Sequence, residues 1–300
     1  MRTFLKVIAL LAVVGAVVFW WVTRPVTPLE DSYAGLTGDP AHGEWVFWAG
    51  GCASCHAAPG AEGEDRLVLS GGVPLASDFG TFHAPNISPD PEAGIGGWSV
   101  ADLGNAMQAG VSPGGHHYYP AFPFTTYIRA EAQDIADLHS FLMTLPTSQV
   151  PSVPHDVGFP FNIRRELGGW KWLFLDGDWV LEDVSDPVVE RGRYIVEALG
   201  HCGECHTPRN MFGGLDKSRW LGGAPNPSGQ GSIPNITPGG LDWSEGDIAE
   251  YLRSGFTPDF DVAGGEMADV VANMAMLSDE DRAAIAAYLK AVPAVGAAAQ

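Results

Sequence analysis

The sequence predicts an all-α protein in which two copies of one small helical domain follow a single N-terminal membrane helix. Three observations support this prediction. The first residues are almost entirely apolar, four landmarks recur in the same order about halfway along the chain, and helix-start signals are common while strand patterns are scarce. We therefore expect a membrane anchor over residues 1–28, a first repeat over 29–146, a linker over 147–185 and a second repeat over 186–300.

The N-terminal segment has the length and composition of a membrane-spanning helix. Between Phe4 and Val22 only Lys6 is charged, and such a run reaches roughly 28 Å as a helix, about one hydrocarbon core. Trp20 and Trp21 suit the far interface. A cleaved signal peptide is the alternative, but no A-x-A cleavage site follows closely. A retained anchor predicts a single-pass protein of the inner membrane, with everything after Arg24 on the periplasmic side.

The repeat is visible in four pairs of segments. "GCASCH" returns as "HCGECH" 150 residues later, "APNISPD" as "IPNITPG" after 149, "GWSVADLGNAMQAGVSP" as "DWSEGDIAEYLRSGFTP" after 145, and "AEAQDIADLHSFLMTLP" as "LSDEDRAAIAAYLKAVP" after 147. The small changes in spacing indicate short insertions within a duplicated domain.

Each repeat has the same predicted order of elements. A helix that begins at an Asp-Pro pair (Asp39 and Pro40, then Asp186 and Pro187) leads into the cysteine motif. A loop rich in Gly and Pro follows, then a short helix (100–109 and 245–253), another loop and a closing amphipathic helix. Ser278 and Asp281 predict a capping box for the last helix. We expect almost no sheet, and a linker with three tryptophans that packs on both repeats.

The charge balance excludes some partners. Sixteen basic against thirty-six acidic side chains give a net charge of −20, which repels nucleic acid. We expect no nucleic-acid partner.

The two CxxCH motifs account for all four cysteines. Cys52 and Cys55, like Cys202 and Cys205, can add to the two vinyl groups of a haem, and the next residue, His56 or His206, then faces the iron as its proximal ligand. A zinc ribbon would need its second pair 15–20 residues away rather than 150, and a thioredoxin-like dithiol would need a βαβ context. Two such motifs in an exported, repeated helical module therefore predict two covalently bound haem c groups.

The second repeat also offers a sixth iron ligand in the loop before its last helix. Met267 lies 61 residues beyond His206. Met274 and Met276 are rivals that alternate like core residues. We expect Met267 to bind the iron.

The first repeat has no methionine in the matching stretch, "GHHYYPAFPF". The residue 61 beyond His56 is His117, whereas counting back from the closing proline gives Pro120. Imidazole binds iron well, so we expect His117 as the ligand, with His116, an open or water-ligated iron, and a distant methionine (Met107 or Met143) as alternatives.

These motifs, together with "FPFNIRRELGGWKWLF" and "GGEMADVVANMAML", resemble the membrane-bound cytochrome c subunits of bacterial alcohol, gluconate and aldehyde dehydrogenases. The resemblance covers about residues 35–293. It implies two class I cytochrome c domains and assigns the haem roles to the two CxxCH motifs and Met267. The sequence departs from those subunits in having two haem motifs where three are frequent, Phe122 where they carry a methionine ligand, and an N-terminal anchor.

The resemblance implies electron transfer between redox proteins, namely a dehydrogenase, a cytochrome bc1-type complex or a terminal oxidase. The alternative is a dihaem enzyme or sensor, peroxidase-like or gas-binding, that works at an open first haem. Arg164, Arg165 and Arg209 are candidates to pair with haem propionates, because basic residues are scarce.

Overall fold

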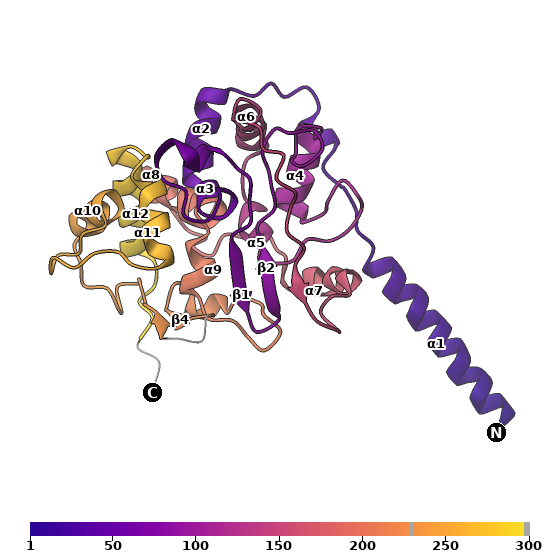
Figure 1. Cartoon of the computed structure of the whole chain (residues 1–300). Helices are drawn as coiled ribbons and strands as arrows, with labels where there is room; N and C mark the ends of the chain where they lie inside the picture. The colour runs from indigo at the N-terminus through magenta and orange to yellow at the C-terminus, as the bar shows by residue number, and fades with distance from the viewer. Residues whose placement is uncertain (228–230, 297–300) are drawn as a thin grey trace.

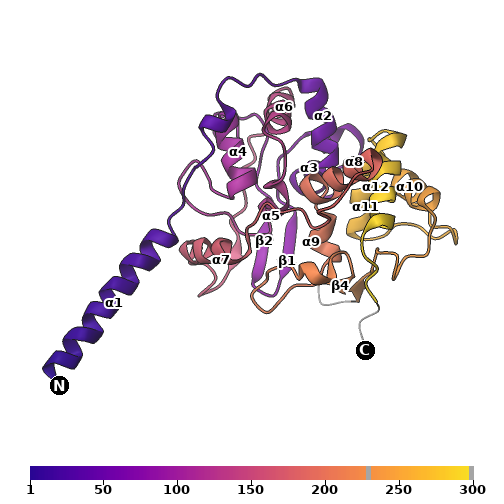
Figure 2. The ribbon, with the colours of Figure 1, turned by 180° about the vertical axis from the view of Figure 1, so that it is seen from behind.

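A computed structural model describes residues 1–227 and 231–296. Helix α1 (Arg2–Val22) projects away from two groups of helices that lie side by side, the first repeat in the middle and the second beyond it (Figures 1 and 2). The residues of α1 are all exposed, and the helix is long and apolar enough to cross a membrane.

The predicted helices of both repeats are present. Asp39 and Asp186 cap the two leading helices by accepting hydrogen bonds from the N–H groups of Ala41 and Val188, and a proline fills the first helical position. The first repeat contains α2 (Pro40–Ala49), α3 (Cys52–His56), α4 (Val100–Ala109), α5 (Phe124–Tyr127) and α6 (Ala132–Leu142). The second contains α8 (Pro187–Tyr194), a π-helical turn η4 (Ile195–Leu199), α9 (Cys202–His206), α10 (Glu245–Ser254), α11 (Glu266–Met274) and α12 (Asp279–Ala291).

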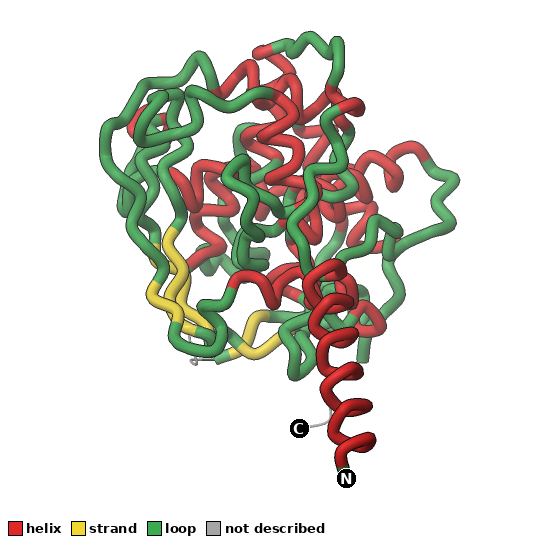
Figure 3. The backbone as a smooth tube through the Cα atoms, turned by 90° about the vertical axis from the view of Figure 1, so that its right-hand side faces the viewer, coloured by secondary structure: helices red, strands yellow, loops and turns green. Residues whose placement is uncertain are grey.

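The sheets are small and lie at the periphery (Figure 3). β1 (Pro74–Ser77) and β2 (Gly80–His83) form an antiparallel hairpin, and β3 (Asp156–Val157) from the linker pairs with β2. β4 (Ala224–Pro225) pairs with β5 (Ser232–Ile233). Short 3-10 turns are η1 (Asp31–Tyr33), η2 (Gly63–Leu67), η3 (Arg164–Glu166) and η5 (Lys217–Arg219). The prediction of a mostly helical fold with few strands is confirmed.

In each repeat the leading helix crosses the closing helix at a glycine. A Cβ atom on Gly43 of α2 would lie 2.0 Å from the carbonyl oxygen of Asp137 in α6. A Cβ on Gly192 of α8 would lie 1.9 Å from that of Ala284 in α12. Since neither position has room for a side chain, the backbones come into direct contact, and the apolar faces of the helices form the core around them, including Phe47, Leu142, Ile195 and Tyr288.

The predicted capping box of α12 is only half formed. Ser278 Oγ accepts a hydrogen bond from the Asp281 N–H at 3.1 Å, but the Asp281 carboxylate does not accept in return from the Ser278 N–H. It accepts instead from Trp45 Nε1 of the first repeat and pairs with Arg191 Nε of α8, both at 2.8 Å. The carboxylate therefore joins the two repeats rather than capping its own helix.

The linker contacts both repeats. Its helix α7 (Leu167–Phe174) carries Lys171, whose Nζ donates to the carbonyl oxygens of Ala109 and Gly110 at the end of α4. Trp170 Nε1 donates to the Phe212 carbonyl of the second repeat at 2.8 Å. Trp172 of the same helix is 76% exposed, so this tryptophan of the linker does not pack on either repeat.

Candidate haem-binding sites

Each CxxCH motif forms a single helical turn, α3 or α9, that begins after a residue in the left-handed region: Gly51 with φ 64° and His201 with φ 43°. One turn places its two thiols on neighbouring positions. None of the four cysteines forms a disulfide, so each sulfur is available for attachment to a haem. Burial raises the pKa of the Cys52 and Cys55 thiols, which is the opposite of the lowered pKa of a redox-active dithiol.

The two histidines that end these turns are held identically. His56 Nδ1 lies 2.8 Å from the Pro85 carbonyl oxygen, and His206 Nδ1 lies 2.8 Å from that of Pro234. Because a carbonyl can only accept, Nδ1 carries the proton and the Nε2 lone pair is left to bind iron. Burial lowers the pKa of both imidazoles, although the carbonyl contacts oppose this, which favours the neutral form that a metal requires. The residues therefore fit covalent haem with a proximal histidine.

Met267 lies in the first turn of α11 and is half-buried, so the segment predicted as a loop is a helix. Met274 is 5% exposed and belongs to the core, whereas Met276 is 55% exposed. Glu266, the neighbour of Met267, lies close enough to the Cys205 thiol to raise its pKa, after burial and the effect of Glu204. The acidic start of α11 thus acts electrostatically on the second CxxCH turn, while the helix itself packs against α2 and α3 of the first repeat.

His117 is buried, with 4% of its surface exposed, and both ring nitrogens have partners. Nε2 lies 2.9 Å from the Thr23 carbonyl oxygen just beyond α1, and Nδ1 lies 3.1 Å from Lys171 Nζ. In this arrangement the ring joins α1 to α7 and presents no free nitrogen to an iron. Its neighbour His116 is exposed.

The three arginines proposed for the propionates have other partners. Arg164 donates to the His117 carbonyl oxygen at 3.1 Å, and Arg165 donates to Thr23 Oγ1 at 3.0 Å. Arg209 pairs with Glu204 at 2.5 Å.

The second of the two residues between the cysteines of each CxxC motif, Ser54 or Glu204, contacts the opposite repeat, which the sequence did not predict. Glu204 Oε1 accepts from Thr125 Oγ1 at 2.6 Å and from Thr126 Oγ1 at 3.2 Å. Reciprocally, Asn273 Nδ2 donates to Ser54 Oγ at 2.5 Å. The two haem-binding turns therefore face each other across the interface between the repeats. The repeat spacing contained this signal, since Thr126 and Asn273 occupy equivalent positions 147 residues apart.

The ring of His201 fills the space between the two turns. It lies edge-on to Tyr127, with ring centres 6.1 Å apart, and a Cβ on Gly51 would lie 3.4 Å from His201 Nε2. Tyr127 donates its hydroxyl to the Gly50 carbonyl oxygen at 3.0 Å. The backbone that leads into the first motif is thus in contact with the residue that begins the second.

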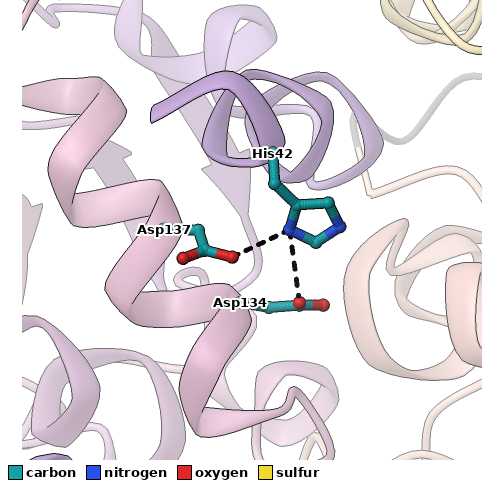
Figure 4. A group of neighbouring side chains, drawn as sticks. All are labelled: His42, Asp134 and Asp137. Atoms are coloured by element: carbon teal, nitrogen blue, oxygen red, sulfur yellow. Dashed lines mark hydrogen bonds and ion pairs between the residues drawn. The ribbon is translucent and has the colours of Figure 1, made fainter. Parts of the chain in front are cut away.

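A separate cluster, His42, Asp134 and Asp137, brings together groups that can bind metals, from α2 and α6 (Figure 4). His42 Nδ1 lies 2.9 Å from Asp137 Oδ2 and 3.6 Å from Asp134 Oδ1. Asp137 also accepts from the Asp39 N–H and from Gln133, and Asp134 accepts from the Tyr194 hydroxyl. With their oxygens so engaged, the carboxylates fasten α6 to α2 and to the second repeat.

Comparison with known proteins agrees with this geometry. The family model for cytochrome c matches residues 40–146 and 189–293. A "Diheme cytochrome c-type" protein of Cereibacter sphaeroides is 63% identical over 96% of this chain and 97% of its own length. The cytochrome c subunit of a quinone-dependent alcohol dehydrogenase from Gluconobacter oxydans is 38% identical over 84% of this chain, and the cytochrome subunit of fructose dehydrogenase from Gluconobacter japonicus is 34% identical over 85%.

The chain spans only about half the length of those two dehydrogenase subunits, 54% and 52%, but nearly all of the Cereibacter protein. Two family matches, each containing one CxxCH turn with its hydrogen-bonded histidine, account for the whole repeated region. The chain belongs to the cytochrome c family and is a dihaem cytochrome with two covalently bound haem c groups.

Proposed function

We propose that this chain is a membrane-anchored, periplasmic electron carrier that takes electrons from a dehydrogenase and passes them to a cytochrome bc1-type complex or a terminal oxidase. The observation that supports this most is the pair of CxxCH turns facing each other across the interface between the repeats, since contact between them shortens the path from one haem to the other. The similarity to cytochrome subunits of dehydrogenases supports a dehydrogenase as the electron donor. It also supports an electron-transfer protein rather than an enzyme.

The haem-binding roles follow the geometry of the two turns. Cys52 and Cys55 would hold haem 1 with His56 as proximal ligand, and Cys202 and Cys205 would hold haem 2 with His206. Met267 would complete the coordination of haem 2. Bound haem supplies the one-electron chemistry, and the protein keeps each proximal imidazole neutral and correctly oriented through its Pro85 or Pro234 contact.

We also propose that α1 remains attached as the membrane anchor, because its end is built into the fold. Thr23 is 1% exposed and lies against Gly168 of α7, where a Cβ would come within 2.5 Å of the Thr23 carbonyl oxygen. Arg165 donates to the Trp20 carbonyl oxygen at 2.5 Å and stacks over the Trp20 ring. Cleavage after Thr23 would remove all of these contacts. With α1 as anchor, the proposed division is 1–28, 29–146, 147–185 and 186–300.

Washed membranes from an expressing strain test the carrier role. Addition of a dehydrogenase substrate, such as ethanol or fructose, should reduce both haems, and oxygen should reoxidise them. A Cys202→Ala/Cys205→Ala variant, which cannot attach haem 2, should still be reduced at haem 1 but reoxidise much more slowly. The proposal would be contradicted if no dehydrogenase substrate reduced the haems and the protein instead turned over peroxide rapidly. That result would favour a peroxidase-like enzyme. The mass of the mature chain tests whether α1 is retained.

A further inference from the structure

The internal duplication allows the ligand side of haem 1 to be located without counting from the CxxCH motif. The segment of interest is the one that carries Met267 in the second repeat. Just before it, both repeats contain an isolated β-bridge: Val111 pairs with His117 in the first repeat, and Phe256 pairs with Val262 in the second. The next hydrogen bond also matches, from the Tyr118 N–H to the Gly110 oxygen and from the Ala263 N–H to the Gly255 oxygen, both 2.8 Å. The spacing here is 145 residues, so His117 is equivalent to Val262, and Met267 falls on Phe122.

The register can also be set from the far side of the segment. The Arg129 N–H bonds to the Thr126 oxygen at 3.2 Å, and the Met276 N–H bonds to the Asn273 oxygen at 3.0 Å. Thr126 and Asn273 both reach the opposite CxxC, as described above. The spacing is now 147 residues, which places Met267 on Pro120. The equivalent of the methionine therefore lies within Pro120–Phe122, where no side chain has an atom that binds iron.

Three neighbouring side chains that carry atoms able to bind iron are committed elsewhere. His117 holds Thr23 and Lys171 through its two ring nitrogens, and Tyr127 gives its hydroxyl to Gly50. Met107 is 4% exposed within the apolar core of the first repeat, and its equivalent on α10 is the core residue Leu252. Phe122 itself is half-buried between the rings of Tyr118 and Tyr127, at 5.6 and 5.7 Å.

We propose that Phe122 takes the place of the methionine ligand in the first repeat, so that haem 1 has no protein ligand at its sixth position and binds a small diatomic molecule there. The inference rests on the proposed attachment of haem 1 to Cys52, Cys55 and His56. The aromatic rings around Phe122 suit an uncharged ligand such as carbon monoxide or nitric oxide. Haem 2, with Met267, should bind neither.

The test uses the full-length protein in detergent, after confirming two haems per chain from the protein mass and the haem spectrum. Titration of the reduced protein with carbon monoxide should give one bound molecule per chain. Phe122→Met should abolish that binding and add an iron–thioether charge-transfer band to the oxidised spectrum. The reciprocal change, Met267→Phe, should give two bound molecules per chain.

His117→Gln is the matched control, because glutamine can still donate to the Thr23 carbonyl. It should leave carbon monoxide binding at one molecule per chain. A six-coordinate bis-histidine signal in wild-type magnetic circular dichroism, with no carbon monoxide bound and the signal lost in His117→Gln, would overturn the inference and establish His117 as the ligand. Failure to find two haems would instead reject the proposed haem attachment, so the two failures are distinguishable.

Discussion

Asp137 shows how one carboxylate can organise several elements. It accepts hydrogen bonds from the Asp39 N–H at 2.8 Å, from Gln133 at 2.7 Å and from His42 at 2.9 Å. Burial alone would raise the pKa of Asp137, but these donors outweigh burial and lower it below its ordinary value of 3.8. The ionised form is therefore the form that the fold stabilises.

We expect Asp137→Asn to lower the free energy of unfolding by about 1–3 kcal/mol at neutral pH. Because the folded pKa is depressed, the contribution of the carboxylate is fully present above the unfolded pKa and is lost as the pH falls through the folded pKa. The difference between variant and wild type should thus shrink below about pH 4. Urea unfolding of the haem-loaded protein at several pH values measures it. Asp78→Asn, at an exposed position, is the control, and a difference that does not change with pH would contradict the argument.

At the scale of elements, the helix crossings depend on glycine. Gly43 meets Asp137 and Phe141 of α6, and Gly192 meets Ala284 and Tyr288 of α12 at equivalent positions. The crossing glycines, Gly43 and Gly192, are 149 residues apart, whereas the CxxCH turns are 150 residues apart. The second repeat therefore has one extra residue between Gly192 and its CxxCH turn. The π-helical turn η4 lies there, which is the form that a one-residue insertion takes within a helix.

Gly192→Ala should destabilise the second repeat by about 1–3 kcal/mol or more, because the methyl group must displace backbone atoms of α12. Gly246→Ala in α10 is the matched control: its Cβ would come no closer than 3.7 Å to another atom, and alanine favours a helix. Urea unfolding monitored by the haem 2 signal compares them. Equal stability of the two variants would show that α8 and α12 can separate slightly without loss.

The sequence was sufficient for elements whose signals are local. The Asp-Pro starts, the CxxCH turns and the helices after Ser99 and Ser244 all follow from neighbouring residues. Helix α11 was missed because its N-cap, Gly265, provides no side-chain cap. The hairpin of β1 and β2 gains its third strand from the distant linker. His117 was chosen by counting residues from His56, and counting cannot show that the two repeats differ in length between Tyr118 and Thr126. The role of His117 as an iron ligand stays a prediction.

At the scale of the whole molecule, polar contacts fix the two repeats around the haem-binding turns. Arg66 of the first repeat donates to the Ala272 carbonyl oxygen at 3.2 Å and to the Asn273 side chain, which in turn donates to Ser54. Asn273 is fully buried. These bonds, with those of Glu204, hold the two turns in one relative position.

Removing a member of this network should loosen the interface without unfolding either repeat. We expect Asn273→Ala to cost about 1–3 kcal/mol, since it removes the buried amide that bonds to both Arg66 and Ser54 and leaves Arg66 only the Ala272 carbonyl oxygen. Limited proteolysis should then cut the linker sooner, and the rate of electron exchange between the haems should fall. Ser254→Ala, at a half-buried site on α10 whose hydroxyl bonds within its own repeat, to Glu250 and Phe256, should change neither. An unchanged exchange rate in Asn273→Ala would mean that the aromatic contact of His201 with Tyr127 is enough to hold the turns.

The two repeats should also differ in redox potential, which would give the molecule a direction. A methionine ligand raises the potential of a haem, and only the second repeat has one in register. The reduction potential of haem 1 should therefore be lower than that of haem 2. The difference should be some fraction of the roughly 0.8 V over which axial ligands set haem potentials. Electrons would enter at the first repeat, beside α1 and α7, and leave from the second. Potentiometric titration of the full chain with Met267→Phe as comparison tests this: the variant should lower only the upper potential and bring the two together. If the reduction potential of haem 1 is higher than that of haem 2 in the wild type, electrons would flow in the opposite direction. The replacement of the methionine by Phe122 would then not determine the direction of electron transfer.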